Sequence, residues 1–359
     1  IYMSFHAKEI EILRDAVDKA EKKTGKKIAQ SEQVKKIISI VEDFIRTHKL
    51  ICYGGTAINN ILPASDQFYD RDISIPDYDF FSSDALNDAK TLADKYKEAG
   101  YTEVEAKAGI HYGTYKVFVN FIPVADITQM EKELFKPVEK EAIQVNGIRY
   151  APPNYLRMAM YLELSRPEGD IGRWEKVLKR LILLNKHYPM KNLRCDSDSF
   201  MRSFESGTKK DKIDVYNAVK DALIDQGVVF FGGYAATLYG RYMPDSQRKV
   251  LEKQADFDVL SDDPKTTAII IKERLKQNDF KNIKFKEHSG IGEIIPSHYE
   301  VTVGDDTVCF IYEPIACHSY NKIKIGDSVV KVATIDTMLS FFLAFLYADK
   351  LYYDHDRIL

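Results

Sequence analysis

The sequence of 359 residues contains only four cysteines, and no two of them form a C-x-x-C pair. This scarcity excludes a zinc ribbon and a disulfide framework, and it favours a reducing compartment. Long apolar runs are also missing. The longest, from Met338 to Ala348, is about half of the roughly 20 residues that a membrane-spanning helix needs. We therefore expect this run to form a buried core helix.

The chain also lacks a strong charge of either sign, because 51 Lys and Arg residues face 54 Asp and Glu residues. A net charge of −3 excludes the global basic field of a histone-like protein, so any contact with nucleic acid must use local patches. No segment near Ile1 has the basic, apolar and cleavage regions of a signal peptide. An apolar fraction of 45% is typical of a globular protein, and the length favours two or three domains.

Helical periodicity dominates the first 49 residues. Apolar side chains spaced at three and four positions predict a helix over 5–24 and a stronger one from Ser31 to His48, with Ser31 as its N-cap. A short buried strand follows and ends at Gly54-Gly55, where the next helix begins. Further helices are expected at 83–99, about 154–165 and 171–187, with strands around 77–81 and over the run 116–127. Strands and helices therefore alternate.

The second half of the chain repeats the first. The segment VVFFGGYAATLYG (228–240) matches LICYGGTAINNIL (50–62), ADFDVLSDD (255–263) matches PDYDFFSSD (76–84), and PIAC (314–317) matches PVAD (123–126). Because the order is kept, we predict a duplicated α/β (α+β) fold. The helical N-terminal segment covers 1–49, the first copy 50–190 and the second copy 213–359, with the polar stretch 189–212 as the boundary.

Two acidic residues stand two positions apart on a predicted strand. Side chains alternate along a strand, so Asp77 and Asp79 project from the same face, and Asp126 joins them if its strand is adjacent. Like charges at about 4 Å cost on the order of 4 kcal/mol per pair at an effective dielectric constant near 20. Three carboxylates without His or Cys suit Mg²⁺ or Mn²⁺. The alternative for the Asp-x-Asp pair alone is a strand end with solvated acids.

A glycine-rich turn precedes these acids. Glycine lets the backbone approach a phosphate at Gly54 and Gly55, and the amides of a helix N-terminus favour an anion. The hydroxyl of Thr56 adds a donor. The alternative is a tight strand-to-helix turn with Thr56 as an N-cap.

The order Gly-Gly-Thr, Asp-x-Asp and a later single Asp resembles the signature of the polymerase-beta-like nucleotidyltransferase superfamily. More closely, the segments YGGTAINNIL, DYDFFS, FIPVADI and LELSRPEGDIGRWEKVLKRLILL resemble the poly(A) polymerase catalytic subunit of poxviruses and related giant DNA viruses. The resemblance implies an enzyme that adds AMP from ATP to RNA 3′ ends without a template, by two-metal nucleotidyl transfer, and releases pyrophosphate. It also implies a catalytic first copy and a degenerate second copy.

The resemblance assigns roles to individual residues. Asp77 and Asp79 would hold the nucleotide-side metal, and Asp126 would join them on a second Mg²⁺ or Mn²⁺ ion. The nucleotide phosphates would be bound by Gly54, Gly55, Thr56, Asn59, Arg173 and Lys176. For Arg173 and Lys176 the alternative is a solvated helix face. In the second copy Cys317 aligns with Asp126, which would leave that copy without a third acid.

The residues alone leave two other functions open. One is a nucleotidyltransferase of the same fold that modifies a small molecule or makes oligoadenylate. The other is an inactive module for RNA binding or assembly. For the polymerase, the expected partners are the RNA 3′ end and either a processivity subunit or a second copy of the chain, without a membrane. The resemblance implies a location in the host cytoplasm, at the viral factory, or in the virion.

Overall fold

The computed structural model describes residues 5–190, 209–242, 244–245, 256–348, 350, 352–353 and 355–359. The chain divides into two compact units, Ile1–Leu156 and Arg157–Leu359. The predicted boundary at 189–212 lies mostly outside the described residues and stays a prediction. Within the described residues, none of the helices is both long enough and apolar enough to cross a membrane. The described cysteines Cys52, Cys309 and Cys317 form no disulfide.

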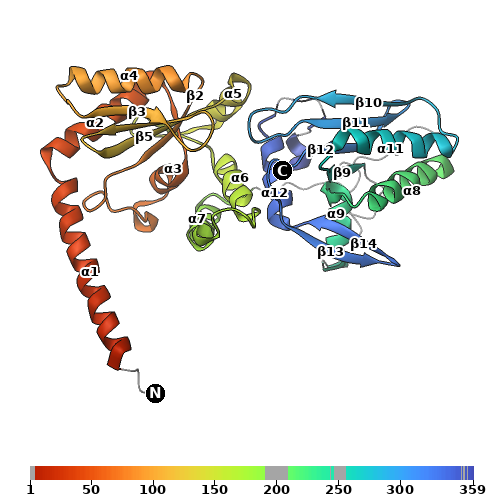
Figure 1. Cartoon of the computed structure of the whole chain (residues 1–359), viewed down its shortest axis with the longest axis horizontal. Coiled ribbons are helices and arrows are strands. Elements are labelled where there is room, and N and C mark those ends of the chain that lie inside the picture. The colour runs from red at the N-terminus through yellow and green to blue at the C-terminus, as the bar shows by residue number, and fades with distance from the viewer. Residues whose placement is uncertain are drawn as a thin grey trace. The chain divides into compact units, whose positions relative to one another are not determined.

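The first unit is a seven-stranded sheet with helices (Figure 1). Its helices are α1 (Phe5–Ala29), α2 (Glu32–His48), α3 (Gly54–Ile61), α4 (Ala85–Glu98) and α5 (Lys132–Glu141). Its strands are β1 (Ile51–Cys52), β2 (Tyr78–Ser82), β3 (Val104–Ala108), β4 (Thr114–Val119), β5 (Ile122–Gln129), β6 (Ile143–Val145) and β7 (Ile148–Tyr150). They lie in the order β3-β4-β5-β2-β1-β7-β6.

Helices α2 and α4 cover one face of this sheet (Figure 1). Ser31 caps α2 as predicted, since its hydroxyl accepts a hydrogen bond from the Val34 amide at 3.2 Å. The apolar stripe of α2 is buried, and its Phe44 ring lies 6.5 Å from that of Phe80 on β2. The Tyr96 hydroxyl of α4 donates to the Ile37 carbonyl at 2.8 Å. Because Phe80 points toward these helices, its neighbour Asp79 points to the opposite face.

The predicted strand over 116–127 is two strands. The chain reverses at Asn120 and Phe121, which have positive φ values of 50° and 63°, so β4 and β5 form an antiparallel hairpin. The sequence did not predict this turn, because its apolar residues continue without a break and Phe121 occupies a position that usually holds glycine.

The second unit repeats the topology. Helix α6 (Pro153–Leu164) spans the division between the units and is followed by α7 (Trp174–His187), α8 (Lys209–Asp225), α9 (Gly232–Tyr239), α11 (Pro264–Gln277), α12 (Ile335–Phe345) and α13 (His355–Ile358). The strands are β8 (Val229–Phe231), β9 (Phe257–Leu260), β10 (Ile283–His288), β11 (His298–Val303), β12 (Asp306–Tyr312), β13 (Tyr320–Ile325) and β14 (Ser328–Ala333).

The strand order of the second sheet, β10-β11-β12-β9-β8-β14-β13, corresponds strand for strand to that of the first. Both sheets also have a register shift in the same hairpin, after Val117 in the first and after Val301 in the second. The prediction of a duplicated α/β fold is confirmed. Most of the apolar run 338–348 is buried in and after α12, as expected.

Candidate nucleotidyl-transfer site

Helix α3 begins directly after β1, at Gly54. The φ of Gly54 is +70°, a conformation that residues with a Cβ rarely adopt. A Cβ built at this position would lie only 2.5 Å from Oδ2 of Asp79. Glycine is therefore needed for both the backbone conformation and the close approach of this carboxylate. The first turn of α3 brings directed amide groups to the same place, and no side chain caps it.

Thr56 lies in this first turn and is not the N-cap of the helix, which is Tyr53. The buried Thr56 hydroxyl donates to the Asp77 carbonyl at 2.6 Å. The Tyr53 amide donates to the Asp79 carbonyl at 2.9 Å. These two hydrogen bonds fix the backbone of the Asp-x-Asp segment against the glycine turn.

The sheet register brings two of the predicted acids side by side. Asp79 of β2 is directly opposite Asp126 of the parallel strand β5. Residues that are opposite on paired strands share a face, so the register confirms that Asp79 and Asp126 come from neighbouring strands. Asp77 lies directly before β2, and its place on the same face stays a prediction.

A lysine that the sequence analysis did not single out completes the row. Lys116 of β4 is opposite Asp126, and its Nζ forms an ion pair with the Asp126 carboxylate. Among the described residues, no three His, Cys, Asp or Glu side chains converge as a metal site, and Lys116 is the cation that contacts Asp126. A single strand over 116–127 would place Lys116 and Asp126 ten residues apart along the chain, so the sequence did not predict that they lie opposite one another in a hairpin.

The electrostatics show that the acids affect one another. The pKa of Asp77 is raised above its usual value, first by partial burial of the carboxyl group and then by the charge of Asp126, while Lys116 opposes the shift. The pKa of Tyr53 is also raised, by burial and then by Asp79. The Tyr53 hydroxyl pairs with the Thr128 hydroxyl at 2.8 Å, and its ring stacks on Phe81 at 3.9 Å. Tyr53 thus forms one wall of the acidic cluster.

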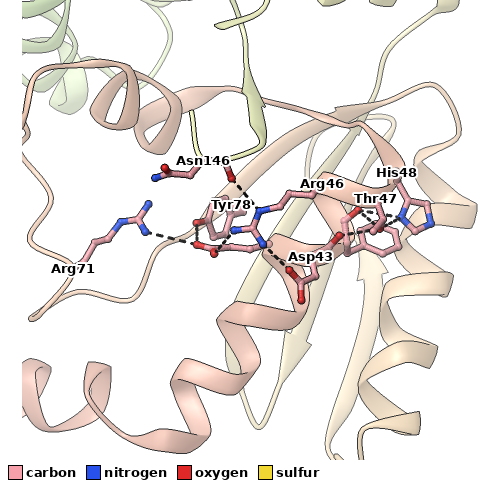
Figure 2. Close-up of polar contacts among 9 residues, drawn as sticks. Asp43, Arg46, Thr47, His48, Arg71, Tyr78 and Asn146 are labelled. Atoms are coloured by element: carbon pink, nitrogen blue, oxygen red, sulfur yellow. Dashed lines mark hydrogen bonds and ion pairs between the residues drawn. The ribbon is translucent and has the colours of Figure 1, made fainter. Parts of the chain in front are cut away.

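The strand that carries the acids is held from behind by a polar network (Figure 2). Tyr78, between Asp77 and Asp79, points to the opposite face and donates to Glu42 of α2 at 2.5 Å. Arg46 donates to Glu42 at 2.9 Å and to the Asn146 carbonyl at 3.2 Å. Arg71, from the loop that leads to Asp77, lies 3.7 Å from Glu42. The network joins α2, β2 and this loop in one arrangement.

Asn59 is buried, and its side-chain oxygen accepts from the amides of Phe68 and Tyr69, both at 2.8 Å. These bonds shape the loop before Asp77. The predicted phosphate contact of Asn59 is not tested by them.

Arg173 and Lys176 belong to the second unit. Arg173 pairs with Glu163 at 3.3 Å, and the pKa of Lys176 is lowered chiefly by the charge of Arg180 one turn away. Their predicted contact with the nucleotide stays a prediction.

The second unit keeps the glycine turn. Gly232 has a φ of +72°, and a Cβ there would collide with Asp258 more severely than one at Gly54 would with Asp79. However, the residue opposite Asp258 on the neighbouring strand is Phe310. The alignment of Cys317 with Asp126 is therefore wrong. Cys317 lies beyond β12, and the third acid is replaced by a buried phenylalanine.

The next position in this row also changes. Glu300 of β11 is opposite Phe310, where Lys116 is opposite Asp126. The second sheet has thus lost both the third acid and the lysine beside it.

Comparisons with known proteins agree with this geometry. Residues 39–170 match the family model described as "Poly(A) polymerase catalytic subunit". Two curated relatives are named "Putative poly(A) polymerase catalytic subunit". The one from Acanthamoeba polyphaga mimivirus is 32% identical over 51% of this chain and 31% of its own length. The one from African swine fever virus (Kenya isolate) is 30% identical over 46% of this chain and 36% of its own length. The chain thus matches about a third of the length of these relatives.

The solved structure described as "Crystal structure of the Megavirus polyadenylate synthase" superposes on the whole chain and on 74% of its own chain, with a TM-score of 0.82 and 21% identity. This likeness confirms the fold. The duplicated α/β fold with a glycine turn beside paired acids is the architecture that the sequence predicted. Residues 39–170 are similar to the poly(A) polymerase catalytic-subunit family, the family that the sequence motifs indicated.

Proposed function

We propose that this chain is a polynucleotide adenylyltransferase that transfers AMP from ATP to the 3′ end of RNA without a template. The observation that carries the proposal is the placement of Asp79 between the Gly54 turn and Asp126, with the Asp77 backbone bound to Thr56 of the same turn. The family match over residues 39–170 supports the choice of reaction. In this reaction the RNA 3′-hydroxyl oxygen bonds to the α-phosphorus of ATP, the bond from that phosphorus to the β-phosphate oxygen breaks, and pyrophosphate leaves.

Asp77, Asp79 and Asp126 would hold Mg²⁺ or Mn²⁺. The donor set fits these ions, since it consists of oxygen ligands only and the pKa of Asp77 is raised by burial and then by the charge of Asp126. Such ions, when bound, lower the pKa of a coordinated hydroxyl and neutralise charge on phosphate oxygens. Through its ion pair, Lys116 would hold the Asp126 carboxylate on the face shared with Asp79.

The chain's own groups would position the nucleotide. Gly54 and Gly55 would present backbone amides to the β- and γ-phosphates, while Thr56 keeps Asp77 at the turn through its hydrogen bond to the Asp77 carbonyl. We include Asn59, Arg173 and Lys176 as further nucleotide contacts. The repulsion between Lys176 and Arg180 would be relieved by a phosphate group.

The RNA 3′ end is the proposed macromolecular substrate. The curated relatives are named as catalytic subunits, which supports a further partner such as a processivity subunit. A second copy of this chain is the other arrangement. Their viral origin supports a location in the host cytoplasm, at the viral factory, or in the virion.

The decisive experiment is primer extension with the purified chain, an RNA primer, Mg²⁺ or Mn²⁺ and each nucleoside triphosphate separately. We expect extension with ATP above the other three. The double variant Asp77→Ala/Asp79→Ala should slow extension by at least ~10³-fold, about 4 kcal/mol of barrier, with the fold intact by circular dichroism. The matched control is Asp256→Ala/Asp258→Ala in the second unit, which should retain most of the activity.

The outcomes separate the alternatives. Equal incorporation of UTP or CTP would indicate another nucleotidyltransferase, and products without primer would indicate oligoadenylate synthesis. RNA binding without extension in any condition would indicate an inactive binding or assembly module. Loss of activity in the control variant as deep as at Asp77 and Asp79 would move the active site to the second unit.

A further inference from the structure

The row of charged residues extends beyond the acids to the edge of the first sheet. Asp79 is opposite Asp126, Asp126 is opposite Lys116, and Lys116 is opposite Lys107 of the edge strand β3. These four side chains share one face of the sheet. The side chains of Lys107 and Lys116 are 50% and 35% exposed. Two lysines therefore follow the acids on the side away from β1 and the Gly54 turn.

An aromatic ring lies on the same face, one step along β4. Phe118 is two residues after Lys116, and the Nζ of Lys107 lies 4.5 Å from the centre of its ring. Glu105, opposite Phe118, pairs with Lys107 at 3.1 Å. This pair is exposed on both sides and is easily exchanged for another anion. The face thus offers cationic groups beside a flat apolar surface.

A second aromatic ring ends the strand. Phe121, in the turn between β4 and β5, is 85% exposed, and its φ of +63° is in the left-handed region. Both turn residues have positive φ, the geometry for which Asn-Gly is the usual sequence. A bulky residue held there without burial gains nothing for the fold. In the same turn of the second unit, Gly304 corresponds to Asn120 and the exposed Asp305 to Phe121.

The in-line geometry of the proposed transfer indicates which of the two substrates would bind to this face of the sheet. In an in-line displacement the attacking and leaving oxygens lie on opposite sides of the phosphorus. The Gly54 turn would place the leaving phosphates on the β1 side of Asp79. The attacking hydroxyl must then come from the β5 side, where Lys116 and Lys107 follow Asp126.

We infer that Lys107, Lys116, Phe118 and Phe121 form a track that holds single-stranded RNA just upstream of its 3′ end. This inference rests on the proposed function. The lysines contact backbone phosphates, and the two rings accept bases by stacking, which tolerates any sequence. Asp126 is four residues from Ile122, the first residue of β5, about 13 Å at the usual rise per residue, and Phe121 directly precedes Ile122, so the track reaches beyond the terminal nucleotide.

The second unit shows that the fold does not require these residues. Lys286 is opposite Glu300, so the two residues occupy the positions of Lys107 and Lys116. Thr302 stands two residues after Glu300, where Phe118 follows Lys116. In the second unit the positive charge of Lys116 is replaced by the negative charge of Glu300, and the aromatic rings of Phe118 and Phe121 have no counterpart. Lys286 therefore provides a matched control for Lys107.

The test is the binding of a 5′-labelled single-stranded RNA of mixed sequence, measured by fluorescence anisotropy without ATP or divalent ions. Lys107→Glu should weaken binding about tenfold and reduce the slope of log affinity against log salt by about 0.7. Phe121→Gly should weaken binding about fivefold or more, while the melting temperature stays equal or rises. Lys286→Glu should bind RNA like the wild type.

Steady-state extension provides the second readout. The KM for RNA should rise in Lys107→Glu and Phe121→Gly while the KM for ATP does not change. Wild-type affinity in both variants, or an equal loss in Lys286→Glu, would overturn the track, as would the absence of RNA binding by the wild type. If the wild type binds RNA and the two variants do not, but no primer is extended with any nucleotide, the track stands and the proposed function fails.

Discussion

The clearest test of the site is to add one methyl group at Gly54 and, separately, at its counterpart Gly232. Both residues have positive φ, +70° and +72°, so alanine should cost about 1–2 kcal/mol of folding free energy at either position. At Gly54 the new Cβ would lie 2.5 Å from Oδ2 of Asp79, whereas an ordinary contact begins at 3.4 Å. The carboxylate or the helix must therefore move by about 0.9 Å.

A displacement of about 1 Å in a reacting geometry costs on the order of 100-fold in rate. We therefore expect Gly54→Ala to slow ATP-dependent primer extension by about 100-fold or more. Gly232→Ala brings a more severe clash against Asp258, but no third acid is present there, so extension should fall by less than about threefold. Urea unfolding should show at least as large a loss of stability in Gly232→Ala as in Gly54→Ala.

The assay compares initial rates at saturating ATP and RNA, at a temperature well below the melting transition of either variant. Gly54→Ser supplies a second variant with the same Cβ. Near wild-type extension by Gly54→Ala, with the expected loss of stability, would refute the view that this glycine positions Asp79 for chemistry. An equal loss of activity in Gly232→Ala would show that the rates report stability alone.

Two further predictions follow from the pKa shifts. The raised pKa of Asp77 means that its ionised form is disfavoured in the folded state, so Asp77→Asn should raise the melting temperature at neutral pH and abolish extension. This stabilising effect should disappear below about pH 3.9, because the wild-type carboxyl group is then protonated in both the folded and the unfolded state. The pKa of the buried His298 is lowered to about 4, chiefly by burial, so as the pH falls from 6.5 to about 4 the second unit should lose up to about 3 kcal/mol of stability. Thermal melts at each pH check both predictions, and a wild-type pH dependence in His298→Gln would contradict the second.

Strand alternation was enough to predict that Phe80 and Asp79 point to opposite faces of the sheet, and the glycine pair was enough to predict where α3 begins. These features depend on local geometry, which a short sequence segment determines. The relation of Asp126 to Asp79 depended on an assumed neighbour, and the register of β2 and β5 confirms it.

Other features depend on pairings between distant segments. The turn at Asn120 and Phe121 contains no glycine or proline, so the residue types did not predict the hairpin or the place of Lys116 opposite Asp126. The similarity of PIAC and PVAD predicted Cys317 as the counterpart of Asp126, but the strand pairing places Phe310 opposite Asp258. Short apolar segments resemble one another by chance, whereas the register is fixed by hydrogen bonds along whole strands.

The two copies also separate what the fold needs from what the site needs. Gly232, Asp258 and the register shift after Val301 persist in a copy without the third acid, so the close approach of the glycine turn to the second acid does not depend on that third acid. Four residues of the first copy have different counterparts in the second: Tyr234 replaces Thr56, Phe310 replaces Asp126, Glu300 replaces Lys116 and Asp305 replaces Phe121. Evolutionary drift after duplication would remove the residues whose only use was chemical. Substitution of a residue that differs between the copies should therefore change catalysis or RNA binding more than stability. Gly54 has a glycine as its counterpart, so its substitution should change catalysis and stability together.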